Sequence, residues 1–589
     1  MGKASMSLRA AALAAATAMV LAACGGGGDG GDDGGDDGGN AAAGEPVKGG
    51  TLTMLSLNQE FTDLDPQRAY TGEDLSFLNA YLTRGLTSYK VSRDEAEQST
   101  LVPDLATDTG TPLNGGEDWE FTLREGSLWE DGTPVTCEDI KYGVSRTFAT
   151  DVITGGPTYA IQYLDIPTAK DGTSVYKGPY VTKDNDTAAF DAAVECDGQK
   201  ITFHLNRAIG DFNYTVTLGF GAVPKAQDTG EKYTQKIVSN GPYKIQEYSK
   251  GNQMVLVRNE NWDPKMDDGY RPAYPDQIVV KFGLDQSVID QRIIRDSGED
   301  QQAFMRESLL SADLATVFND DRFADRRISG QSPYVIYRCI NVEKVPNLQH
   351  RQAIAVALDR AQLKQIAGGD YAGDLGDGVI KPNLAIDYEP SGMWEDMFGQ
   401  AIPDSGDPEY AKQLIEESGE PMPTITYSYS QNPDADKGAA AIKASLEKAG
   451  ITVKLNPIEA SAYYNVIFDK DRATELMNNG WGPDWPNAST VIPPIFTMKG
   501  GWDVSRVDDK EFNEKVDAAL SETDRDAQAQ MWKDLNKEAM SQVWVIPTLF
   551  EKDYRLAGSK VKSASGENGS PYLGGFAGSW PYNDMYVVD

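Results

Sequence analysis

Residues 119–140 read WEFTLREGSLWEDGTPVTCEDI. Apolar and polar residues alternate over 120–124, as they do in a half-buried β-strand. Residues 131–134 (DGTP) predict a tight turn, because Gly adopts a positive φ without steric cost and Pro fixes its own φ. Thr136 is a good helix N-cap, and acidic residues in the first turn suit the helix dipole. The stretch therefore predicts a strand, a turn and a helix, and the helix carries one apolar stripe: Ile140, Val144 and Phe148.

Strand and helix patterns continue on both sides of this stretch. Residues 201–205 (ITFHL) alternate in the same way, and 254–258 (MVLVR) and 277–282 (QIVVKF) are further apolar strands. Upstream, leucines at helical spacing predict a helix over 75–85 that ends at a glycine. The sequence has no internal repeat of the kind that is typical of a solenoid or a propeller.

A second α/β region begins near residue 340. Residues 350–367 predict one helix, which ends at two glycines. Residues 424–430 (TITYSYS) predict a strand, 437–449 a helix and 451–458 (ITVKLNPI) another strand. A strand, a helix and a strand within about 35 residues are typical of a parallel crossover unit.

The N-terminus carries the pattern of an export signal. Residues 10–23 are an apolar run after a positively charged start, too short to span a bilayer comfortably and suited to the core of a signal peptide over 1–23. The run ends in Leu-Ala-Ala-Cys, which resembles a bacterial lipobox with Cys24 as the lipidated residue. The alternative is a plain secretory signal with a chance cysteine. Residues 24–46, rich in Gly and Asp, predict a disordered tether.

Composition excludes several classes of function. The 589 residues hold 54 Lys and Arg against 90 Asp and Glu, a net charge of -36. Such a charge excludes a general nucleic-acid binder and disfavours binding to anionic lipid through a polybasic segment, because both kinds of binding need clustered cations. The only histidines, His204 and His350, are too few for a multi-histidine metal centre. No serine-hydrolase or zinc-protease motif occurs, so we expect no enzyme, metal or cofactor.

Three cysteines remain after Cys24, in a compartment that favours disulfides. They allow three pairings, of which we favour Cys137 with Cys196, since both lie in one expected lobe. Cys339 sits in a strand-like run and is expected to be a buried thiol. The absence of any disulfide stays open as an alternative.

Several motifs together resemble one family, the family 5 extracellular solute-binding proteins, which include the peptide and oligopeptide receptors of ABC importers. They occur in the family's order: PDLA at 103–106, the stretch at 119–139, NGPY at 240–243, Arg351 to Arg360, and GWGPDW at 480–485. The resemblance implies an α/β, two-lobed periplasmic-binding-protein-like fold (type II, large cluster with an extra subdomain). Its hinge would consist of two crossing segments, which we expect near 337–341 and 544–548.

The resemblance also implies a division of the mature chain. Lobe I would combine 47–88, 217–335 and 546–589, with 89–216 as an inserted subdomain, and lobe II would span 336–545. The turn at 131–134 is expected to be structural and to lie outside the ligand site.

In peptide-binding members of the family, the aspartate at the place of Asp484 accepts the α-amino group of the ligand. A buried carboxylate that faces an ammonium forms a charge-assisted pair. The alternative is that Asp484 merely turns the chain before Pro486. The other candidate ligand-binding residues are Trp481, Gly482 and Trp485 beside it and, from their positions in the family's order, Tyr463 and Tyr70. Only Lys470 and Arg472 are basic just before this motif, so the group that holds the ligand's carboxylate stays open.

The resemblance implies a receptor that captures peptides by hinge closure and delivers them to an ABC permease with its ATPase subunits. We expect a monomer on the outer face of the cell membrane, held there by its N-terminal lipid alone. Two alternatives remain: a receptor for oligosaccharides such as cellobiose, and a secreted hydrolase.

Overall fold

The computed structural model describes residues 45–170, 172–459, 462–497, 501–574 and 578–588. The expected signal peptide, the lipidation site Cys24 and the tether as far as residue 44 lie outside these residues. The described chain is a mixed α/β protein with two hydrophobic cores. None of the helices within it is both long and apolar enough to cross a bilayer.

The stretch at 119–140 folds as its sequence predicts. Its strand, β5 (Asp118–Thr122), pairs antiparallel with β7 (Lys200–His204). The helix is α3 (Cys137–Arg146), and its capping box joins the Thr136 backbone and hydroxyl to the Asp139 carboxylate, at 2.9 Å each. Two edge strands complete a sheet of order β4-β5-β7-β6: β4 (Thr111–Leu113) and β6 (Val194–Asp197).

A disulfide joins Cys137 and Cys196. It links the first residue of α3 to β6, so it ties the helix to the edge of its own sheet. Cys339 is a buried free thiol. Both observations agree with the favoured pairing.

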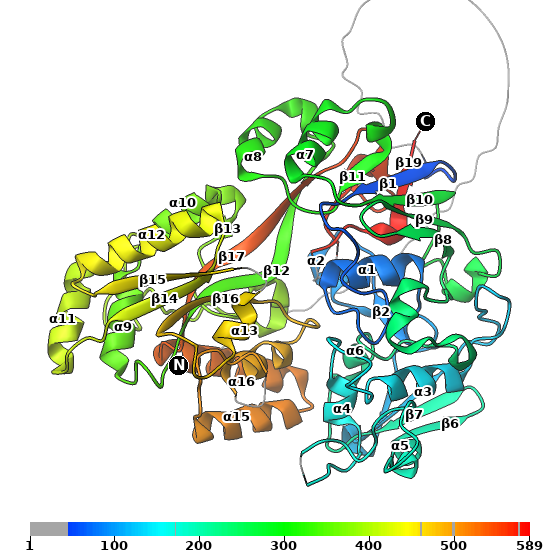
Figure 1. Ribbon diagram of the computed structural model, residues 1–589, viewed down its shortest axis with the longest axis horizontal. Coiled ribbons are helices and arrows are strands. Elements are labelled where there is room, and N and C mark those ends of the chain that lie inside the picture. Colours follow the sequence, from blue (N-terminus) through cyan, green and yellow to red (C-terminus); the bar gives the residue numbers. More distant parts are fainter. Residues whose placement is uncertain (1–44, 171, 460–461, 498–500, 575–577, 589) are drawn as a thin grey trace, which may run out of the picture. The chain divides into compact units, whose positions relative to one another are not determined.

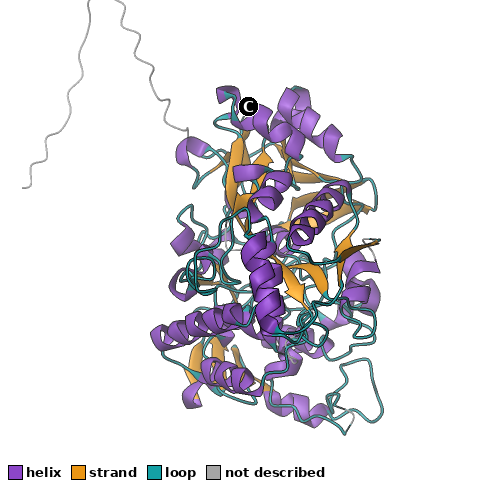
Figure 2. Cartoon of the chain, turned by 90° about the vertical axis from the view of Figure 1, so that its left-hand side faces the viewer, coloured by secondary structure: helices purple, strands orange, loops and turns teal. Residues whose placement is uncertain are grey.

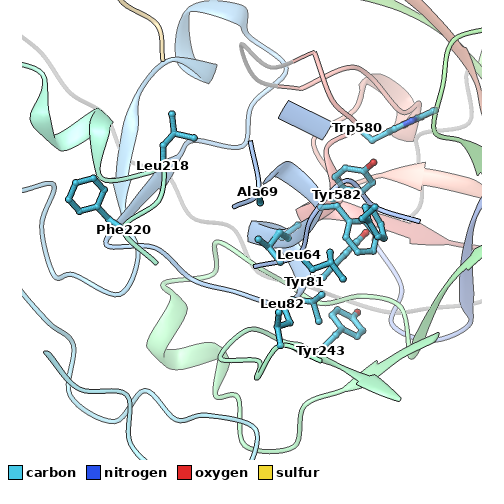
Figure 3. Packing of buried hydrophobic residues seen from close by; sticks show 14 of the residues in the cluster. Leu64, Ala69, Tyr81, Leu82, Leu218, Phe220, Tyr243, Trp580 and Tyr582 are labelled. Atoms are coloured by element: carbon cyan, nitrogen blue, oxygen red, sulfur yellow. The ribbon is translucent and has the colours of Figure 1, made fainter. Parts of the chain in front are cut away.

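The first core surrounds a five-stranded sheet of order β11-β1-β10-β9-β8. Its strands are β1 (Thr51–Leu55), β8 (Tyr243–Ser249), β9 (Gln253–Arg258), β10 (Gln277–Lys281) and β11 (Ala303–Met305). Helix α1 (Gly72–Tyr81) buries Tyr81 edge-on against the rings of Tyr243 and Tyr582 (Figure 3). The C-terminal segment therefore packs onto an N-terminal helix in this core.

The second core surrounds a six-stranded sheet of order β13-β17-β12-β16-β14-β15. The predicted crossover is confirmed: β14 (Ile425–Ser430) and β15 (Val453–Ile458) pair in parallel, and α12 (Pro433–Lys448) connects them. The remaining elements of this region are β13 (Gly373–Asp374), β16 (Leu476–Trp481), α11 (Pro408–Ser418), α13 (Tyr463–Ile467), α14 (Ile492–Phe496), α15 (Lys510–Ser521) and α16 (Arg525–Ser541).

The prediction of one helix over 350–367 is wrong. The structure has two helices, α9 (Leu348–Ala357) and α10 (Arg360–Ala367). Leu358 between them is extended (φ -75°, ψ 124°), and the Asp359 carboxylate accepts the Gln362 amide N–H at 2.8 Å. An aspartate at this position caps a new helix, which competes with continuing the old one.

Two long strands connect the cores: β12 (Arg327–Ile340) and β17 (Val545–Leu556), which pair antiparallel and run side by side in Figure 1. In β12 the change of core falls between Ile328 and Val335, and in β17 between Phe550 and Tyr554. Segments 337–341 and 544–548, where we expect the hinge, lie within the second core or at its border, and the hinge position stays a prediction.

The change of core coincides with an irregularity in the β12–β17 ladder. The register shifts between Gln331 and Val335, around Pro333. Proline has no N–H to donate to the ladder, and a bulge bends the strand that carries it. The irregular segment around Pro333 therefore lies where the two strands pass from one core to the other.

Shorter elements complete the fold, and in Figure 2 purple helices flank the orange strands. Near α1, β2 (Thr87–Tyr89) pairs with β3 (Leu101–Pro103). The others are α2 (Glu95–Gln98), α4 (Tyr159–Tyr163), α5 (Thr187–Ala193), α6 (Phe212–Thr215), α7 (Gln286–Arg295), α8 (Ser311–Phe318), β18 (Val561–Ser563) and β19 (Met585–Val587).

Candidate functional site

Asp484 lies just beyond the end of β16. That strand pairs with β12 up to Trp481, which lies opposite Val335 beside the irregular segment. The chain then leaves the sheet, and the Asp484 backbone N–H donates to the Thr490 hydroxyl at 3.1 Å. Two prolines flank this turn and limit its backbone freedom. The Asp484 carboxylate is thus held on a short, constrained loop between the two cores.

Two tyrosines from the N-terminal part of the chain donate to this carboxylate. The Tyr70 hydroxyl lies 2.9 Å from Oδ2 of Asp484, and the Tyr159 hydroxyl donates to the same oxygen. Tyr70 precedes α1 and Tyr159 begins α4, so separate segments of this part supply the two donors. Among the described residues none donates to Oδ1 of Asp484. A carboxylate that accepts on one oxygen only retains capacity for a further donor.

Burial raises the pKa of the Asp484 carboxyl to about 6, although the hydroxyls of Tyr159 and Tyr70 partly offset this effect. Burial and the nearby Asp484 charge also raise the pKa values of Tyr70 and Tyr159. Both hydroxyls therefore stay protonated and act as donors. An ammonium at Oδ1 would stabilise the ionised carboxylate, since an opposite charge lowers the pKa of an acid.

Asp484 lines a cavity of about 180 Å³. Both cores contribute to its wall: Tyr334, Gly482 and Pro483 come from the second region, and Leu75 and Leu218 from the first. Aromatic residues form much of the remainder: Tyr70, Tyr89, Tyr270, Tyr572, Trp580 and Tyr582. Flat apolar rings that also carry hydroxyl groups suit a ligand with both apolar and polar parts.

Gly482 fits its place because a side chain there would collide with the wall. A Cβ atom built on Gly482 would lie 3.1 Å from the Tyr334 ring and 3.2 Å from Pro333. The glycine lets the loop that carries Asp484 pack closely against the segment between the cores. Of the six predicted ligand-binding residues, Tyr70, Gly482 and Asp484 line this cavity.

The other three predicted residues do not line the described cavity, and their side chains bond to the protein. Trp481 donates to the Thr490 carbonyl at 2.7 Å and packs against Trp502. Trp485 is buried, and its ring meets that of Tyr159 edge-on at 4.8 Å. Tyr463 is also buried, and its hydroxyl donates to the carbonyl groups of Ser428 and Asn478. Their roles in ligand binding stay predictions.

Tyr159 and Asp211 contribute to the site without any signal in the sequence that marks them. Oδ2 of Asp211 accepts from Nε1 of Trp485 at 2.7 Å and from the Ser489 hydroxyl at 2.8 Å. Burial raises the pKa of Asp211, and these two hydrogen bonds partly offset the rise. Asp211 and Tyr159 precede or begin short helices far from residue 484 in the sequence, so only the folded chain brings them together.

Residues 100–503 match the family of bacterial extracellular solute-binding proteins, family 5 middle. This chain belongs to that family. The dipeptide-binding protein DppE of Bacillus subtilis is 21% identical over 535 residues, which cover 87% of this chain and 89% of DppE. The periplasmic oligopeptide-binding protein OppA of Salmonella typhimurium is 24% identical over 545 residues, or 88% and 90% of the two chains.

Solved structures of similar proteins have the same fold as this solute-binding protein. The clavulanic acid biosynthesis oligopeptide binding protein 2 superposes with a TM-score of 0.80 at 25% identity, over 93% of this chain and 98% of its own. The unliganded open form of the murein tripeptide binding protein MppA gives 0.65 at 18% identity, over 92% and 98%. The predicted fold class, a two-lobed periplasmic-binding-protein-like α/β fold of the large cluster, is confirmed.

The family consists of binding proteins and not of enzymes, so this solute-binding protein is a binder. Within the described part of the chain, no three His, Cys, Asp or Glu side chains are grouped to hold a metal ion. The cavity wall offers one carboxylate, one ammonium, hydroxyl groups and aromatic faces.

Proposed function

We propose that this solute-binding protein is the receptor of an ABC importer for peptides. It captures a peptide in the cavity beside Asp484 and delivers it intact to the permease, which the ATPase subunits drive. The observation that carries the proposal is the Asp484 carboxylate: two tyrosines hold Oδ2, while Oδ1 receives no hydrogen bond from the described chain.

Asp484 would accept the free α-amino group of the peptide. An ammonium donates to a carboxylate in a charge-assisted bond, which is about twice as strong as a neutral one. A capped amine would leave the half-buried carboxylate without a counter-charge, and a buried unpaired charge is costly. The geometry therefore favours peptides with a free N-terminus over N-acetylated ones.

The aromatic wall would receive the rest of the peptide. Rings bury apolar side chains, while ordered water and backbone groups satisfy the peptide's amides. The peptide-binding relatives DppE and OppA support this class of ligand.

Capture would proceed by closure of two lobes. We place lobe I at 47–88, 217–335 and 546–589, its inserted subdomain at 89–216, and lobe II at 336–545. The bonds from Tyr70 and Tyr159 to Asp484, and from Trp485 to Asp211, cross between these lobes. Opening would break these bonds while β12 and β17 bend between the cores, a hinge motion known in periplasmic binding proteins.

We place the mature protein, as a monomer, on the outer face of the cell membrane. Lipid on Cys24 and the tether that follows would keep it near the permease. Nothing else in the chain would need to contact the membrane.

A second candidate ligand is an oligosaccharide such as cellobiose, because aromatic faces also stack on sugar rings and a carboxylate accepts sugar hydroxyls. Melting temperature distinguishes the two, since a ligand that binds only the folded state raises it. We expect free peptides to raise it, and N-acetylated peptides and cellobiose to leave it unchanged. A rise with cellobiose alone would overturn the proposal in favour of the sugar.

A further inference from the structure

The charges of the cavity are few and opposite. Of the described residues that line it, Asp484 alone is anionic and Lys90 alone is cationic. The remaining lining side chains are uncharged. A ligand that enters this cavity therefore meets one anionic residue and one cationic residue in its wall.

The backbone of Lys90 is fixed by a hydrogen bond, and its side chain is half-exposed. It follows β2 directly, and its backbone N–H donates to the Thr100 carbonyl at 2.9 Å. Its ammonium lies 2.9 Å from a carboxylate oxygen of Glu97, and the two side chains are 43% and 48% exposed. An exposed ion pair of this kind contributes little free energy, and an ammonium has three donors. Lys90 can therefore keep or exchange this partner when a second carboxylate approaches.

A peptide carboxylate needs such a cation here. The protein carries a net charge of -36, and the cavity already holds the Asp484 carboxylate. An anionic C-terminus placed among uncharged rings would lose its hydration without an electrostatic gain. A cation at the cavity wall removes that penalty.

We propose that Lys90 binds the α-carboxylate of the peptide whose amino group Asp484 accepts. The ligand is then a short peptide with both termini free, its two charges matched by two residues that line the same aromatic cavity. This inference rests on the proposed function. It names a partner for the carboxylate end of the ligand. The sequence left that partner open, because Lys470 and Arg472 are the only basic residues just before the Gly-Trp motif.

The test separates the two termini chemically. Di- to tetrapeptides built from Ala, Leu and Phe, each as the free acid and as the C-terminal amide, are titrated calorimetrically into the wild-type protein and into Lys90→Gln and Lys90→Arg. We expect the wild type to bind the best acid about tenfold or more tighter than its amide. Lys90→Gln should bind acid and amide equally, with the amide's affinity unchanged. Lys90→Arg should retain the preference for the acid.

A matched control is Lys412→Gln. Lys412 has a side-chain exposure of 42%, and its ammonium lies 2.6 Å from Glu409 in a similar surface ion pair. It lies on α11, away from the residues that line the cavity. This variant should bind every peptide as the wild type does. Glu97→Gln, which removes the competing partner of Lys90, should strengthen the preference for the acid.

The competing site is a second cavity that shares Tyr572 with the first and is lined by Arg93. If Arg93→Gln abolishes the preference for the acid and Lys90→Gln does not, the inference is overturned and the ligand extends into that second cavity. Equal losses for acid and amide in Lys90→Gln would overturn it as well. If no peptide of the panel binds, the proposed function fails and the inference fails with it. Binding that discriminates only at the amino end removes the inference and leaves the proposed function intact.

Discussion

The hydroxyl oxygen of Tyr70 lies 2.9 Å from Oδ2 of Asp484, although 414 positions separate the two residues in the sequence. Tyr70 precedes a helix of the first core, and Asp484 follows a strand of the second. The bond therefore joins the two parts of the chain that β12 and β17 connect. The carboxylate that we propose for the ligand's amine is thus also a point of contact between the two lobes that we propose.

The pH dependence of binding should report the state of Asp484. Its folded-state pKa is raised to about 6, so the carboxyl is mostly ionised at pH 7 and mostly protonated at pH 5. Since only the ionised form pairs with an ammonium, peptide affinity should fall by about tenfold from pH 7 to pH 5. The measurement is a calorimetric titration between pH 7 and pH 5. Asp484→Asn is the control, and its affinity should not show this fall with pH. An affinity that rises toward pH 5 in the wild type would contradict the assignment.

The same shift has an opposite consequence for the free protein. Because the folded-state pKa of Asp484 is raised, its protonated form favours folding, and this contribution is lost as the pH rises through about 6. Asp484→Asn should therefore stabilise the ligand-free protein at pH 7 and change its stability little at pH 4. Urea unfolding at both values checks this expectation. A loss of stability at pH 7 in the variant would show that the ionised carboxylate is a net stabilising group.

Tyr159→Phe should make Asp484 harder to ionise. The variant removes a hydroxyl that donates to Oδ2 and lowers the pKa of this carboxyl, so the midpoint of the pH profile should move upward. Tyr70→Phe should move it in the same direction but less. The matched control is Tyr142→Phe, which removes a tyrosine hydroxyl from a different carboxylate, that of Asp228. An unchanged midpoint in Tyr159→Phe would exclude the tyrosine as an electrostatic partner of the site.

Substitution of Trp485 distinguishes a structural role from a role in ligand binding. The residue is buried, and its indole N–H donates to the buried Asp211 carboxylate. Trp485→Ala should lower the free energy of unfolding by about 3–5 kcal/mol, as deletion of a buried aromatic residue does. Urea unfolding measures this loss. Unchanged stability combined with lost peptide binding would instead make Trp485 part of the ligand's wall.

Local patterns in the sequence predicted the elements that depend on neighbouring residues. The capping box of Thr136 and Asp139 and the parallel crossover of β14 and β15 are as predicted, because both are encoded within a few tens of residues. The break before Asp359 was missed, because the same residue fits a helix interior and an N-cap. The place where β12 changes core was not predicted, because it depends on packing partners from the whole chain.

The candidate site was predictable through its loop and Tyr70, which the resemblance marks. Gly482 and Asp484 lie in a motif that the resemblance marks, whereas Tyr159 sits in a stretch without any motif and meets Asp484 across 325 positions. Contacts over such distances follow from the packing of the two cores and leave no periodic pattern in the sequence. Lys90 likewise belongs to no motif. It becomes a candidate only because the folded chain places it in the wall of the cavity.

The disulfide should stabilise the attachment of α3 to its sheet without affecting ligand binding. Cys137 and Cys196 are 59 positions apart, and closure of a loop of this size restricts the unfolded chain. Replacing both residues with Ala should lower the free energy of unfolding by about 2–5 kcal/mol in urea and leave the peptide affinity unchanged. Cys339→Ala, which alters a buried free thiol and keeps the disulfide, is the control and should lose stability in reducing agent as the wild type does. A stability of the wild type that reducing agent does not change would contradict the pairing.

The central claim is that Asp484 accepts the free amino group of a peptide, and titration calorimetry with matched ligands tests it most directly. Each peptide of the Ala, Leu and Phe panel is measured with a free and with an N-acetylated terminus, against the wild type and Asp484→Asn. The wild type should bind the free form about a hundredfold tighter than the acetylated form. This factor lies within the roughly 2–5 kcal/mol that loss of one partner of a buried charge pair costs. Asp484→Asn should bind both forms weakly and alike. Equal affinity of the wild type for free and acetylated peptides would contradict the account.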